Sequence, residues 1–188
     1  MPATTTLKNR QLYKKRNPLA YGGQLRSLRV ERAGPRPIAT GNSMHVVLRA
    51  SRAKGPLSFK QPRNAQKIQA IVKRFAAKYR VEIISLANVG NHLHFHLKLA
   101  KLHGYKPFIR AVTAAIAMAV AGKSRWNKVK EKFWDYRPFT RLVLSKSGYL
   151  RLTDYIEINK LEGAGYSRFD AGFIIARAHD RQRGWPSG

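Results

Sequence analysis

The chain alternates between stretches with an apolar residue at every second position and stretches with one at every third or fourth. Period-two alternation predicts strands over 43–50, 81–87 and 91–99, and turn residues at 88–91 join the last two as a hairpin. Helical spacing predicts helices over 62–79, 105–121 and 147–161. An aromatic and β-branched run over 132–144 predicts one or two further strands.

The order strand, helix, strand, strand, helix, strand or strands, helix indicates an α+β fold. We expect a ferredoxin-like βαββαβ sheet with two helices on one face and the other face free, followed by a tyrosine-bearing helix. Residues 1–41 read as a basic arm broken by glycine and proline, 42–162 as the folded domain, and 163–188 as a loop-rich tail with a short helical piece near 171–178.

The strand over 91–99 has two different faces. His92, His94 and His96 share one of them, and the other is apolar, with Leu93, Phe95, Leu97 and Leu99. Imidazoles two positions apart lie roughly 6–7 Å from each other at the backbone, so both can reach one cation. Histidines on a half-exposed strand can also be plain polar residues. The fact that half of the six histidines fall within five residues favours a site.

His96 and His45 are not expected to bind a metal. We expect His96 to be inert rather than a ligand. His45, in the strand over 43–50, is expected to point at the nucleic-acid face or at a hydrogen-bond partner, and not to bind a metal.

The helix over 147–161 carries a second group of candidates. Tyr155 and Asn159 are four residues apart and share one face. A phenol has a pKa of about 10, but it can attack phosphorus when a metal polarises the phosphate oxygens. Two imidazoles and a carboxamide would give Mg²⁺ or Mn²⁺ three ligands. Tyr155, like Tyr149 on the same helix, could instead be a packing residue.

Composition narrows the partners. The chain has 37 Lys+Arg against 9 Asp+Glu, a formal net charge of +28, so a polyanion such as nucleic acid is expected to bind. The absence of cysteine excludes disulfides and thiolate zinc sites, and the few acids disfavour a carboxylate two-metal nuclease. No apolar segment reaches the ~20 residues of a membrane span. We therefore expect no membrane partner and a cytoplasmic, nucleoid-associated location.

Two motifs carry a family resemblance. Asn91-His92-Leu93-His94 resembles the histidine-hydrophobic-histidine motif of the HUH endonucleases, and Tyr155-Ile156-Glu157-Ile158-Asn159 resembles the catalytic helix of their single-tyrosine branch. That branch comprises small insertion-sequence transposases and REP-associated tyrosine transposases. The resemblance covers 43–161 and marks 42–162 as an HUH transposase-like catalytic domain. Lys160, where many members have proline, and Val89-Gly90, where Met-Pro is common, depart from the pattern.

The resemblance implies specific roles and a specific reaction. His92 and His94 would bind the metal, Asn159 would be its third ligand, and Tyr155 would be the nucleophile. The reaction implied is cleavage of hairpin-bearing single-stranded DNA by transesterification, which leaves a 5′-phosphotyrosine and a free 3′-hydroxyl and needs no nucleotide cofactor. A homodimer is possible, because in dimeric relatives the tyrosine helix can serve the metal site of the partner.

Basic residues are the candidates for contacts to the nucleic acid. The arm is either a solvated tail or a segment that lies on the phosphate backbone, and the density of like charge favours the second. The candidates are Lys14, Lys15, Arg16, Arg26, Arg29, Arg49, Arg52, Lys54, Lys123, Arg125, Arg137 and Arg141. Two other hypotheses also account for the charge: a domesticated, non-catalytic protein that binds DNA or RNA hairpins, and a binder similar to ribosomal proteins.

Overall fold

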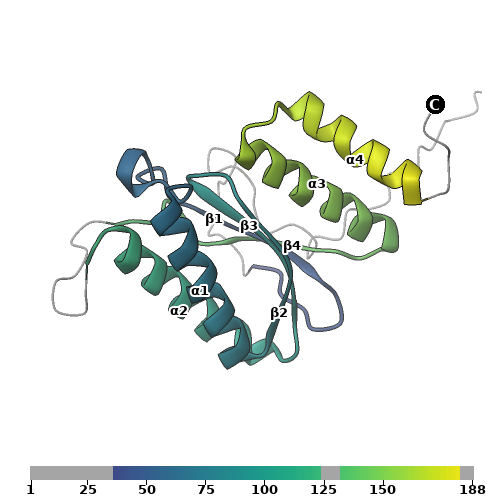
Figure 1. Cartoon of the computed structure of the whole chain (residues 1–188). Coiled ribbons are helices and arrows are strands. Elements are labelled where there is room, and N and C mark those ends of the chain that lie inside the picture. Colours follow the sequence, from purple (N-terminus) through teal and green to yellow (C-terminus); the bar gives the residue numbers. More distant parts are fainter. Residues whose placement is uncertain (1–35, 124–131, 183–188) are drawn as a thin grey trace, which may run out of the picture.

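The computed structural model describes residues 36–123 and 132–182, which form one antiparallel sheet with helices on both faces (Figure 1). The strands are β1 (Met44–Arg49), β2 (Val81–Asn88), β3 (His92–Leu99) and β4 (Phe139–Leu142). They lie in the order β2-β3-β1-β4, and every neighbouring pair is antiparallel. The run over 132–144 thus gives a single short strand.

In the described part of the chain, four helices accompany this sheet. α1 (Pro62–Tyr79) and α2 (Tyr105–Val120) connect strands, while α3 (Lys146–Ala164) and α4 (Arg168–Gln182) follow β4. Short 3₁₀ turns lie at Gly55–Leu57 and Leu102–Gly104. The α+β class is confirmed, and the finer ferredoxin-like assignment stays a prediction. None of the helices in the described ranges is long and apolar enough to span a membrane.

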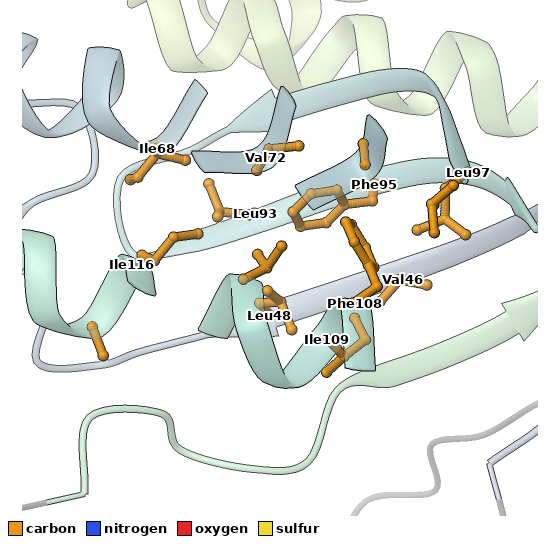
Figure 2. Packing of buried hydrophobic residues seen from close by; sticks show 14 of the residues in the cluster. Val46, Leu48, Ile68, Val72, Leu93, Phe95, Leu97, Phe108, Ile109 and Ile116 are labelled. Atoms are coloured by element: carbon orange, nitrogen blue, oxygen red, sulfur yellow. The ribbon is translucent and has the colours of Figure 1, made fainter. Parts of the chain in front are cut away.

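The main core fills the space between the sheet and the pair α1 and α2. Leu93 and Phe95 of β3 are buried and point toward the two helices, as Figure 2 shows. The helices contribute the buried side chains Ile68, Val72, Phe108, Ile109 and Ile116. Burial of apolar area stabilises a fold by roughly 25 cal/mol per Å². The apolar face of the histidine strand is therefore fixed against this core, and its histidine face is fixed on the other side.

α3 packs on the face that we expected to be free, so that expectation is corrected (Figure 1). Leu152 and Ile156 of α3 are buried with Ala87 of β2, and Val143 and Tyr155 pack around them. α3 has an apolar face of its own, which gains stability by leaving water. The histidine face is therefore partly covered.

An irregularity in β2 prepares the surface on which α3 packs. The pairing of β2 with β3 shifts register between Ile83 and Ser85. Ile83 and Leu86 pack toward the main core, whereas Ala87 packs against α3 and Ser85 bonds Glu157 of α3, Oγ to Oε1 at 3.1 Å. An extra residue in one strand of a pair changes which side chains reach each face. Small side chains at these positions let α3 come close.

The tail beyond residue 163 also differs from the expectation of a loop-rich segment. α4 is a helix of 15 residues, well beyond the short piece expected near 171–178. Ala171 is fully buried, and two side-chain contacts connect α4 to α3: Nε2 of His179 lies 3.1 Å from Oδ1 of Asp154, and Arg168 forms an ion pair with Glu162 at 3.2 Å. The helix was hard to predict because its large apolar residues, Phe169 and Phe173, are exposed.

Candidate active site

Tyr155 lies against the histidine face of the sheet within a single chain. Its ring centroid is 5.5 Å from that of His94 and 5.7 Å from that of His45, with edge-to-face geometry in both pairs. The rings of His92 and His94 are 4.8 Å apart. The structure therefore brings together the two histidines of the motif and the tyrosine that follows about sixty residues later.

The position of Tyr155 follows from how α3 is capped and anchored. Ser145 caps the start of the helix by accepting a hydrogen bond from the backbone N–H of Gly148, and Gly165, with φ 107°, ends it in the left-handed conformation. Leu152 and Ile156 are buried on either side of Tyr155 in the sequence. The tyrosine is half-buried, and the Arg168 guanidinium lies 6.0 Å from its ring centroid.

Both histidines of the motif use the nitrogen Nδ1 for a hydrogen bond. Nδ1 of His92 donates to Oδ1 of Asn91 at 2.6 Å, because a carboxamide oxygen can only accept. Nδ1 of His94 lies 3.1 Å from Nε2 of His45. The other nitrogen of His94, Nε2, is buried and has no hydrogen-bond partner within the described part of the chain. A buried polar atom without a partner is costly, so this nitrogen is a candidate donor for a bound cation.

The three imidazoles are held in the neutral form at pH 7. Burial, followed by the neighbouring rings of His45 and His92, lowers the pKa of His94 to about 3. Burial and the cation of Arg141 lower the pKa of His45 to about 4. Burial and Arg49 also lower the pKa of His92. A neutral imidazole keeps a lone pair on one nitrogen, which is the form that binds metals.

Asn159 is buried one turn after Tyr155, and its amide nitrogen donates to the backbone oxygen of Tyr155 at 2.6 Å. This bond leaves the amide oxygen as the atom that can serve a ligand. Among residues 36–123 and 132–182, no three side chains of histidine, aspartate or glutamate gather as a metal site. The remaining candidate donors for a divalent cation are the imidazoles of His92 and His94 and the amide oxygen of Asn159.

A pocket of about 620 Å³ opens beside this cluster, between α3 and the strands β1 and β4. His45, His94 and Tyr155 line it, together with the cations Arg141 and Arg151. The sequence analysis did not select Arg151. Its signal was its position four residues before Tyr155, which puts both side chains on one face of α3.

The other basic candidates are scattered. Arg49 pairs with His92 across β1 and β3 and forms an ion pair with Asp135 at 3.5 Å, and Arg141 pairs with His45 across β1 and β4. Arg52, Lys54, Lys123 and Arg137 are exposed and do not line the pocket. The remaining candidates lie outside the described residues: Lys14, Lys15, Arg16, Arg26, Arg29 and Arg125.

His96 has a structural environment. It is fully buried, its Nε2 lies 2.8 Å from Oγ of Ser43, and its ring packs on Tyr149 with centroids 4.7 Å apart. His96 lies opposite His45 across β1 and β3, but its hydrogen bond and its ring contact are to Ser43 and Tyr149 and not to Tyr155.

Comparisons with known proteins give fold-level similarity. No protein-family model and no curated protein matches the sequence. Among solved structures, the chain is similar to a REP-associated tyrosine transposase bound to a REP hairpin, at 15% identity and a TM-score of 0.56 over 70% of this chain and 74% of that one. A putative transposase from Deinococcus radiodurans is also similar, at 16% identity and a TM-score of 0.39 over 69% of this chain and 98% of that one. The chain thus shares the fold of the first protein.

Proposed function

We propose that this protein is a transposase-type enzyme that cleaves and rejoins hairpin-bearing single-stranded DNA, with Tyr155 as the nucleophile. The observation that carries the proposal is the phenol ring of Tyr155 held edge-on against His94 and His45, beside a pocket that contains two arginines. The shared fold with a transposase bound to a hairpin supports the substrate class. The protein would act in the cytoplasm, on the nucleoid.

The proposed reaction exchanges one phosphodiester for another. The phenol oxygen of Tyr155 attacks phosphorus and loses its proton, the bond from phosphorus to the 3′ oxygen breaks, and that oxygen takes up a proton. A 5′-phosphotyrosine and a free 3′-hydroxyl result. The bond energy stays in the adduct, so rejoining requires no nucleotide cofactor. Attack of a 3′-hydroxyl on the adduct reverses these steps and releases the tyrosine.

The other residues of the site would bind and orient the phosphate. Arg141 and Arg151 line the pocket with fixed positive charge that suits a phosphodiester. Mg²⁺ or Mn²⁺ held by His92, His94 and Asn159 would polarise the phosphate oxygens. Both halves of the site come from one chain, so the proposal requires no second copy, and homodimer formation stays a prediction.

The test is covalent trapping. The protein is incubated with labelled single-stranded oligonucleotides, in which a constant hairpin is flanked by randomised tracts, and with Mn²⁺ or Mg²⁺. Adducts that survive a denaturing gel are then measured. We expect an adduct with the wild type and none with EDTA, with Tyr155→Phe or with the pair His92→Ala and His94→Ala. DNA affinity should change less than twofold in Tyr155→Phe, because only a hydroxyl is removed.

Tyr149→Phe is the matched control. Tyr149 lies on the same helix but packs on His96, so this variant should form the adduct as the wild type does. If the wild-type protein binds the hairpins and never forms an adduct, the proposed enzymatic function is refuted. That result would favour the non-catalytic hairpin binder, for which the net charge of +28 is sufficient.

A further inference from the structure

His45 lies where it can control the chemistry of His94. The two rings are nearly parallel and meet edge to edge, with centroids 5.4 Å apart and an interplanar angle of 15°. Nε2 of His45 is 3.1 Å from Nδ1 of His94, and both side chains are buried. Edge contacts from Phe139 and Tyr155, with centroids at 5.9 and 5.7 Å, fix the ring of His45 from other sides. The contact is therefore built into the packing.

The direction of this hydrogen bond decides whether His94 can bind a cation through Nε2. A neutral imidazole has one N–H and one lone pair. If Nδ1 of His94 donates to His45, the lone pair of His94 is on Nε2. If Nδ1 accepts, Nε2 carries the hydrogen and has no lone pair for a metal. His45 acting as the acceptor therefore selects the ligand form of His94.

The neighbouring histidine of the motif has an equivalent arrangement. Nδ1 of His92 donates to the carboxamide oxygen of Asn91, so the lone pair of His92 is on Nε2. Nε2 of His94 is the buried atom without a partner. Metal-binding histidines commonly donate their second nitrogen to a carboxylate, a backbone carbonyl or water, and this hydrogen bond fixes the ring orientation and the tautomer.

We propose that His45 is a positioning residue that accepts a hydrogen bond from Nδ1 of His94 and so holds His94 Nε2 ready for a divalent cation. This inference rests on the proposed function, because it assumes that His92 and His94 bind the metal. It assigns His45 no contact with the cation and none with the DNA.

The first test measures Mn²⁺ affinity by isothermal titration calorimetry on the full chain without DNA. His45→Leu removes the acceptor and keeps an apolar side chain, and we expect a 10–100-fold loss of affinity. His45→Gln places an amide oxygen at similar reach and should recover most of that loss. Ser43→Ala is the matched control, since it removes the partner of His96 and should bind Mn²⁺ as the wild type does.

The second measurement reads the tautomer directly. Long-range ¹H–¹⁵N spectra of the metal-free wild type should show the hydrogen of His94 on Nδ1, and His45→Leu should lose this preference. Melting temperature and metal-free DNA binding report whether each variant is folded.

Each outcome has one meaning. Mn²⁺ affinity in His45→Leu equal to the wild type, a loss in His45→Gln as large as in His45→Leu, or a wild-type His94 with its hydrogen on Nε2 would overturn the role of His45. A wild type that binds no Mn²⁺ would refute the proposed metal site itself, and the role of His45 with it. A His45→Leu chain that fails to fold leaves the decision to His45→Gln and to the wild-type spectra.

Discussion

The buried imidazoles should make the protein sensitive to mild acid. In the unfolded chain a histidine has a pKa of about 6.5, whereas burial lowers the pKa to about 4 in His45 and about 3 in His94. As the pH falls below 6.5, the unfolded state binds protons that the folded state cannot bind. The contribution of these histidines to stability is thus fully present above a pH of about 6.5, and it decreases as the pH falls toward their pKa values in the folded state.

Urea unfolding at pH 7.5 and pH 5, at constant ionic strength, measures this effect. We expect the free energy of unfolding to fall at up to about 1.4 kcal/mol per pH unit for each such histidine. His45→Leu should show a smaller decrease than the wild type. The positive charges of Arg141 near His45 and Arg49 near His92 act in the same direction as burial. Equal stability at both pH values would contradict the prediction.

Single residues of the site differ in how far the sequence determined them. Tyr155 and the two histidines could be selected because each motif has a recognisable spacing. The contact between His45 and His94 could not be predicted from the sequence. His94 lies opposite Val47 and meets His45 only as a diagonal neighbour across the strand pair. That register depends on how the strands align, which one strand's sequence does not show. Asn159 is placed near Tyr155, but no hydrogen bond joins it to the imidazoles in the described ranges.

At the scale of elements, the packing of α3 on β2 is the contact that positions the tyrosine. Gly163 of α3 comes so close to β2 that an added Cβ would lie 2.7 Å from the backbone oxygen of Asn88. A backbone atom in a sheet cannot move aside easily, so α3 would have to shift. We expect Gly163→Ala to cost about 1–3 kcal/mol of stability. Covalent adduct formation should fall more than hairpin affinity, since the shift changes the position of Tyr155 relative to His94.

Gly172→Ala on α4 is the control for this prediction. An added Cβ there meets nothing within 4 Å, and alanine in a helix is favoured over glycine by about 0.5–1 kcal/mol. Chemical unfolding and the trapping assay, applied to both variants, separate the two effects. If Gly163→Ala unfolds at the same urea concentration as the wild type and forms as much adduct, α3 does not depend on this close approach.

Most helices and strands could be predicted from the sequence because each buries only one face, which leaves a regular spacing of apolar residues. α1 shows this well, since its buried Ile68, Val72 and Ala76 recur at helical spacing between Pro62 and Arg80. The covering of the histidine face was missed for a physical reason. It depends on the register shift at Ile83/Ser85, which brings the small residues Ser85 and Ala87 to the α3 side. The consecutive isoleucines 83 and 84 interrupt the period-two pattern and were the available signal.

At the scale of the whole molecule, the sheet separates the main hydrophobic core from the candidate active site. α1 and α2 cover one face of the sheet and α3 covers the other (Figure 1). The main core lies on the first face, and the imidazoles, Tyr155 and the pocket lie on the second. The charge of the chain as a whole determines how it meets DNA. Because the net charge is +28, binding should release counterions from the DNA. The logarithm of the binding constant should therefore fall linearly with the logarithm of the salt concentration.

The slope of that salt dependence tests whether the basic arm lies on the phosphate backbone. Lys14, Lys15 and Arg16 lie outside the described residues, so their role stays a prediction. If they contact phosphates of the single-stranded tract, replacing all three with glutamine should reduce the slope by about two, at ~0.7 per contact. The same change at Arg63, Lys73 and Lys78 of α1, across the sheet from the pocket, should leave the slope unchanged. Equal slopes for both triple variants and the wild type would mean that the arm is a solvated tail. A reduced slope in the α1 variant alone would place the DNA on the opposite face of the sheet and contradict the site around Tyr155.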